Sequence, residues 1–67
     1  MLNSLLLWNK IGRIVTLIAS DMGIGPEKAL TLFYRSRTNV LLRTPSTMLY
    51  TFSDRYLADE VMQEYKN

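Results

Sequence analysis

The sequence predicts an all-α protein, a small bundle of three or four helices with an extended connector around residues 44–52. Three observations support this fold class. Apolar residues recur at three- and four-residue steps in the first third of the chain. Pro26 and Ser53 stand where helices typically begin. The 67 residues include no cysteine and no histidine, so no disulfide or thiolate zinc site can stabilise the fold. We expect one domain over residues 1–67.

The first helix is expected from about residue 3 to residue 22. Asn3 or Ser4 is a suitable N-cap, and Gly23 is a natural stop in the left-handed conformation. Gly12 weakens the helix but would allow a close helix crossing. One side of this helix carries a broad apolar stripe, formed by Leu7, Trp8, Ile11, Ile14, Val15, Ile18 and Met22.

A second helix is expected to begin at Pro26, with Gly25 as its cap. The side chains that it is expected to turn inward are Leu30, Phe33 and Tyr34. Residues 36–39 form either an irregular corner or a new cap, and residues 40–42 either a helical turn or a brief strand. Pro45 then indicates a turn.

Residues 48–52 have some β character and are expected to form the extended connector. Ser53 caps the last helix, which we expect from Asp54 to about Tyr65. Six aromatic residues are expected to fill the second half of the core: Phe33, Tyr34, Tyr50, Phe52, Tyr56 and Tyr65.

Catalysis is not indicated by the residue types present. Without histidine, the usual nucleophilic triads lack their base. No glycine-rich phosphate loop is present, and the acids Asp54, Asp59, Glu60 and Glu64 are expected to form a solvated helix face. The sequence therefore predicts no catalytic residue, no metal ligand and no cofactor, and it favours a non-enzymatic protein.

The apolar stripe of the first helix has two interpretations. It can form the core of a single protomer, or it can also pack against a second copy. Leu5, Leu6 and Leu17 make the stripe broader than a small core needs, which favours a homodimer. The candidate self-association residues are Leu7, Trp8, Ile11, Ile14, Val15 and Ile18. We expect such a protein to act by binding another protein.

The charges are unevenly distributed along the chain, whose net charge is +2. Residues 28–51 carry Lys28, Arg35, Arg37 and Arg43 and no acid, whereas residues 53–67 have a net charge of −2. The four cations are candidates for contact with an anion or a nucleic acid, with Tyr34 as a stacking residue. The favoured interpretation is that they are solvated or that they meet the acidic tail of another protomer. A weak nucleic-acid-binding or antitoxin-like regulator is therefore the alternative function.

No membrane-spanning segment is expected. The apolar run at residues 11–19 is interrupted by Arg13 and falls short of the roughly 20 apolar residues that a spanning helix needs. The first residues lack the basic stretch of a secretory signal. We expect a cytoplasmic protein.

Residues 25–65 resemble a family of short bacterial proteins of unknown function. The resemblance lies in the string from Pro26 to Thr38, in residues 40–42, in Leu49-Tyr50 and in residues 53–57. Met48 departs from the pattern, which has a glycine in the turn. The resemblance implies a small helical bacterial protein and assigns no catalytic or binding residue.

Overall fold

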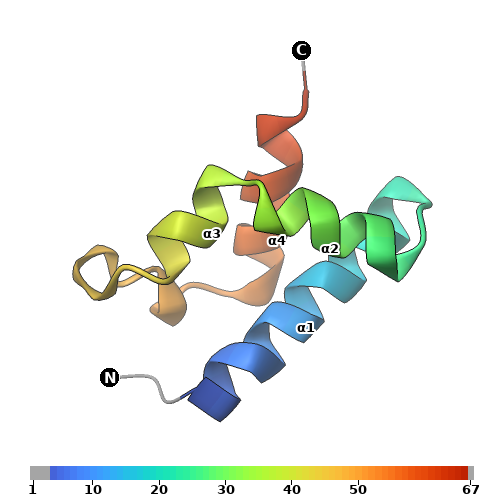
Figure 1. The fold of residues 1–67 in the computed structure, drawn as a ribbon. Helices are drawn as coiled ribbons and strands as arrows, with labels where there is room; N and C mark the ends of the chain where they lie inside the picture. The colour runs from blue at the N-terminus through green and yellow to red at the C-terminus, as the bar shows by residue number, and fades with distance from the viewer. Residues whose placement is uncertain (1–3, 67) are drawn as a thin grey trace.

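The structure is a computed structural model that describes residues 4–66. Within that range it contains four α-helices, two single 3₁₀ turns and no strand, which confirms the all-α prediction. The elements are α1 (Ser4–Met22), α2 (Pro26–Tyr34), α3 (Arg37–Leu42), η1 (Pro45–Thr47), η2 (Leu49–Thr51) and α4 (Asp54–Glu64). The first helix, α1, packs against both α2 and α4, and α3 packs against α4 (Figure 1). Asn3, one of the two suggested N-caps, lies outside the described residues.

The core lies where α1 meets α2 and α4. Its largest fully buried side chains are Phe33, Ile14, Ile18, Leu57 and Val61. Four residues of the predicted α1 stripe are buried in it, namely Ile11, Ile14, Val15 and Ile18. These four residues of the stripe therefore belong to the core of the protomer.

The prediction of an aromatic second half of the core is wrong for most of its members. Phe33 is buried and Tyr50 is partly buried, whereas the other four rings are exposed: Tyr34, Phe52, Tyr56 and Tyr65. The side chains that meet α1 from α2 and α4 include Ala29 and Ala58, both fully buried. Because small side chains at a contact let helices approach closely, the core has little room for further rings.

The predicted starts of α2 and α4 are confirmed by their caps, and of the two alternatives for residues 36–39 the structure has the new cap, which begins α3. Gly25 precedes Pro26 at the start of α2. The hydroxyl oxygen of Ser36 accepts a hydrogen bond from the Asn39 amide (3.0 Å) at the start of α3. Ser53 accepts one from the Tyr56 amide (3.0 Å) at the start of α4. These side chains satisfy N–H groups that the helix itself leaves unpaired.

The predicted extended connector is instead folded into the two turns η1 and η2. The Thr47 hydroxyl donates to the carbonyls of Leu41 (2.6 Å) and Thr44 (2.8 Å), and the Thr51 hydroxyl donates to that of Met48 (2.7 Å). These bonds hold the chain in tight turns. Met48 links them with a left-handed backbone (φ 58°), a conformation that favours glycine.

Ion pairs join α1 to the start of α4. The Lys10 ammonium lies 2.8 Å from both the Asp54 carboxylate and the Phe52 carbonyl oxygen, and Arg13 Nε lies 2.6 Å from Asp54. Partial burial acts to raise the pKa of Asp54, but the hydrogen bonds and charges of Lys10 and Arg13 outweigh it and lower that pKa. Further along α1, Asp21 pairs with Arg55. The Asp54 cluster and the Asp21–Arg55 pair thus tie α4 to α1 at two places along α1.

The end of α4 caps the start of α3. One Glu64 carboxylate oxygen accepts the Arg37 amide (2.7 Å), and the other accepts the Thr38 amide (2.9 Å) and hydroxyl (2.7 Å). Partial burial acts to raise the pKa of Glu64, but these hydrogen bonds and the Arg37 charge lower it overall. The carboxylate was expected on a solvated face; it instead ties two helices together.

Replacing Gly12 with alanine is expected to stabilise the protein. Gly12 lies inside α1, and a methyl group there would meet nothing within 4 Å. The close crossing suggested for this residue does not occur within the protomer. Because glycine costs a helix interior roughly 1 kcal/mol relative to alanine, Gly12→Ala should raise the free energy of unfolding by about 0.5–1 kcal/mol. Urea denaturation followed by circular dichroism measures this change.

Gly23→Ala provides the control for that measurement. Gly23 has equally open surroundings, but its φ is 65°, so an added Cβ is strained by the backbone itself. We expect a loss of about 1 kcal/mol. A destabilising Gly12→Ala would contradict the open environment described here for Gly12.

Candidate interaction surface

The structure separates the six predicted self-association residues into two groups. Ile11, Ile14, Val15 and Ile18 are buried, so the prediction that they form a contact between protomers is corrected: the same atoms already pack against α2 and α4. Leu7 packs partly buried against the core. Trp8 is half exposed, and it is the member of the group that remains available to a partner.

Trp8 belongs to a contact among three helices. The Arg43 guanidinium carbon lies 5.3 Å from the centre of the Trp8 ring and 6.0 Å from that of Tyr34. Both distances are within the range of a cation–π interaction. Trp8 comes from α1, Tyr34 ends α2 and Arg43 directly follows α3, so residues remote in sequence converge here. Both rings keep 50% of their surface exposed.

A buried side chain fixes the position of Arg43. The side-chain carbonyl oxygen of Asn39 accepts a hydrogen bond from Arg43 Nε (2.8 Å), and the Asn39 amide nitrogen donates to the Tyr34 carbonyl (3.3 Å). Asn39 is itself buried and joined to Ser36. Within residues 4–66 the Arg43 side chain makes no ion pair, although its planar guanidinium suits a carboxylate or phosphate. The Arg43 guanidinium is therefore held in one orientation by Asn39, while its positive charge is not neutralised by an acidic side chain of the described residues.

Exposed apolar side chains lie beside each member of this contact. Leu5 precedes Trp8 by three residues and is 70% exposed, and Val40 precedes Arg43 by three and is 61% exposed. Leu30, also exposed, precedes Tyr34 by four. Residues at these spacings are neighbours on a helix surface. We call the whole set the aromatic–arginine surface: Trp8, Tyr34, Arg43, Leu5, Leu30 and Val40.

The other predicted cations do not share the arrangement of Arg43. The side chains of Lys28 and Arg35 are exposed and have no hydrogen-bond or ion-pair partner among residues 4–66. Arg37 is exposed at the start of α3, where the Glu64 carboxylate accepts its main-chain amide and lies close enough for the two charges to interact. Of the four, Arg43 is thus the one held against aromatic rings.

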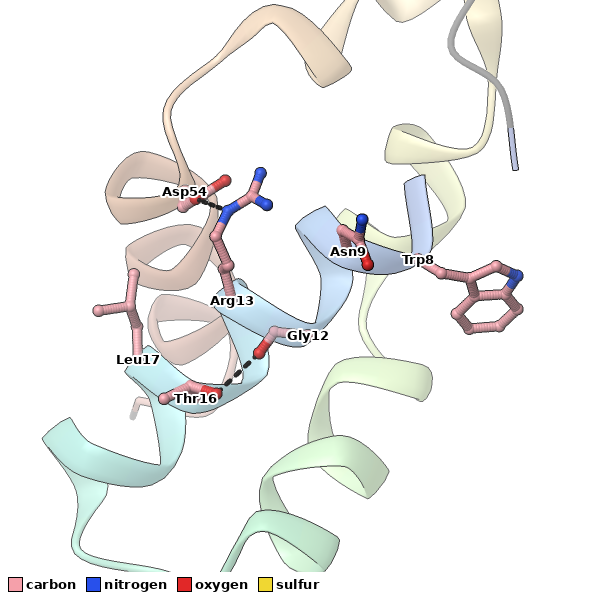
Figure 2. Close-up of a pocket in the computed structure, with 7 residues that line it drawn as sticks. All are labelled: Trp8, Asn9, Gly12, Arg13, Thr16, Leu17 and Asp54. Carbon is pink, nitrogen blue, oxygen red and sulfur yellow. Dashed lines mark hydrogen bonds and ion pairs between the residues drawn. The ribbon is translucent and has the colours of Figure 1, made fainter. Parts of the chain in front are cut away.

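A shallow pocket lies along the outer side of α1 (Figure 2). It is lined by Trp8, Asn9, Gly12, Arg13, Thr16, Leu17 and Asp54. The Trp8 indole points away from the Arg13–Asp54 ion pair, and the Thr16 hydroxyl donates back to the Gly12 carbonyl (2.8 Å). The charged pair and the Thr16 hydroxyl are thus already engaged, and neither is an oriented but unneutralised group of the kind that Arg43 presents.

No three His, Cys, Asp or Glu side chains in residues 4–66 are grouped as a metal site would need. In the same range, none of the helices combines the length and apolar character required to cross a bilayer.

Sequence reasoning named Trp8, Tyr34 and Arg43 but assigned them to different roles. The sequence predicts Trp8 as part of an apolar stripe that forms a dimer interface. It predicts Arg43 as one of four candidate cations for contact with an anion, with Tyr34 as a stacking residue. The role of Asn39 was missed. A signal for it exists, because Asn39 and Arg43 are four residues apart, and side chains at this spacing can meet on a helix. Nothing in the sequence places Trp8 against the end of α3.

Comparison with protein-family models, with curated proteins and with solved structures gave no significant match to this chain. The resemblance to short bacterial proteins therefore stays a prediction, and the inferences that follow rest on the residues and contacts described above.

Proposed function

We propose that the protein is a non-enzymatic, cytoplasmic interaction module that binds another protein through the aromatic–arginine surface. The observation that carries the proposal is the contact of Arg43 with the half-exposed rings of Trp8 and Tyr34. Tryptophan, tyrosine and arginine are the residue types that dominate binding energy at protein interfaces.

The proposal is also supported by the fixed position of the Arg43 side chain before any partner binds. Binding normally costs free energy because mobile side chains must be fixed. Here the hydrogen bond from Arg43 to the buried Asn39 fixes the guanidinium beforehand. A partner that covers the rings would also cover the exposed Leu5 and Val40, which removes further apolar area from water.

Arg43→Glu is expected to weaken partner binding about tenfold or more. The substitution removes both ring contacts and reverses the charge at the centre of the surface. The full chain, biotinylated, is used to capture proteins from an extract of the cells that produce it. The captured proteins are then quantified by mass spectrometry for wild type and variant, with circular dichroism to show that both are folded.

Arg35→Glu is the matched control, because it makes the same charge change at an exposed residue that contacts no ring described here. We expect it to retain the partner. Equal retention of every captured protein by wild type, Arg35→Glu and Arg43→Glu would contradict the proposal.

The alternative is a weak nucleic-acid-binding or antitoxin-like regulator that uses Lys28, Arg35, Arg37 and Arg43 together. The observation in its favour is that Lys28 and Arg35 have no acidic partner among residues 4–66. Each phosphate contact contributes to the salt dependence of binding, so this function requires Arg35→Glu and Arg43→Glu to weaken binding alike. Capture that is lost after nuclease treatment would also favour it.

A further inference from the structure

A second exposed surface lies at the start of α4. The rings of Phe52 and Tyr56 pack with their centres 5.0 Å apart and remain 41% and 44% exposed. Glu60 follows Tyr56 by four residues, so both lie on the same side of α4. The Glu60 side chain is exposed and has no hydrogen-bond or ion-pair partner within residues 4–66. We call Phe52, Tyr56 and Glu60 the acidic–aromatic surface.

The two surfaces are complementary in charge and in apolar character. The first presents an unpaired, oriented cation between aromatic rings, and the second presents an unpaired carboxylate beside aromatic rings. Their segments carry opposite charge along the chain: residues 28–51 hold four cations and no acid, and residues 53–67 have four acids and two cations. Within the protomer Arg43 and Glu60 are not paired.

We propose that the protein binds a second copy of itself, with the aromatic–arginine surface of one protomer on the acidic–aromatic surface of its partner and Arg43 paired with Glu60. This inference names the partner for the surface assigned above and rests on that proposed function. In a two-fold dimer the pairing occurs twice, because each protomer supplies both surfaces. A standard interface buries about 800 Å² per partner, under a fifth of the protomer's 4570 Å².

Charge reversal tests the pairing. Sedimentation velocity of the full chain from low micromolar to millimolar concentration should show a dimer of twice 7.8 kDa. Arg43→Glu and Glu60→Arg, each alone, place like charges opposite each other and should weaken the dimer about tenfold or more. An equimolar mixture of the two variants restores opposite charges at both contacts of the mixed dimer. The mixture should therefore associate with close to wild-type affinity.

Trp8 provides a second measurement at the surface itself, because it is the only tryptophan in the chain. Its fluorescence emission should shift to shorter wavelength with rising concentration in the wild type and in the mixture, and not in either variant alone. Arg35→Glu and Glu27→Arg are the controls, since both side chains are exposed and their charged groups have no ion-pair partner among residues 4–66. Both should dimerise like the wild type.

Three results would overturn the inference. One is a wild-type protein that stays monomeric at millimolar concentration with constant Trp8 emission. The second is a dimer that neither reversal weakens, and the third is a mixture that fails to recover. Each leaves the proposed function testable by itself, because capture of a different protein that is lost in Arg43→Glu and kept in Arg35→Glu would still support it.

Discussion

Replacing Phe33 with alanine should remove most of the stability of the protein. The ring is fully buried and belongs to the same core cluster as side chains of α1 and α4. Truncating a buried phenylalanine to alanine costs about 3–5 kcal/mol, because both the transfer of the ring and the remaining cavity are unfavourable. At about 0.05–0.15 kcal/mol per residue, a chain of this length has a total of only about 3–10 kcal/mol. Thermal and urea denaturation, followed by circular dichroism, measure the loss.

Phe52→Ala is the matched control for Phe33. The same ring is removed, but Phe52 lies on the surface, where its described ring contact is with Tyr56. We expect a loss of about 1 kcal/mol or less. Equal losses for the two variants would show that the core is not centred on Phe33.

Glu64→Ala is expected to cause the second large loss of stability. The substitution leaves the Arg37 and Thr38 amides and the Thr38 hydroxyl without their acceptor. Loss of a helix cap costs about 0.5–2 kcal/mol, and hydrogen bonds to a charged group are the stronger ones, so we expect a loss of about 2 kcal/mol at pH 7. Glu60→Ala, one turn earlier on α4, should change the free energy of unfolding by less than about 0.5 kcal/mol.

The dependence of stability on pH provides an independent test of the role of the Glu64 carboxylate. Its pKa is lowered in the folded protein from an ordinary value of 4.5, so the folded state binds this proton less readily than the unfolded chain. The stabilisation is therefore complete above about pH 5, and it is lost as the pH falls through the lower pKa of the folded state. Urea unfolding at several pH values should show wild type and Glu64→Gln converging in acid. A constant difference between them down to pH 2 would contradict a role for the ionised carboxylate.

The helices could be predicted from the sequence because their signals are local. The spacing of Ile11, Ile14 and Ile18 indicates one buried side of a helix, and the hydroxyls of Ser36 and Ser53 cap amides only three residues further on. Such signals act within one or two helical turns. They do not depend on how the helices pack.

The tertiary contacts could not be predicted in this way. The α1 stripe fits equally well against a second copy or against α2 and α4, and which one covers it depends on the crossing of whole helices. Glu64 and Arg37 are 27 residues apart, and no periodicity joins them. Tyr56 is exposed while Ala58, two residues later on the same helix, is fully buried, and which of the two faces α1 depends on how the helices pack. The candidate surface was missed as a unit for the same reason, since Trp8, Tyr34 and Arg43 meet only after three helices have packed.

The packing of the first helix against the last also has a consequence for the growing chain. Ile14 and Ile18 belong to the same buried cluster as Leu57 and Val61, which are synthesised some forty residues later. At roughly 5–20 residues per second, the ribosome needs about 2–8 s to add the intervening segment. During that interval the apolar stripe of α1 lacks the cover that α4 will provide. A message truncated before the codon for Leu57 would yield a peptide that keeps this stripe exposed, prone to aggregate or to be retained by chaperones.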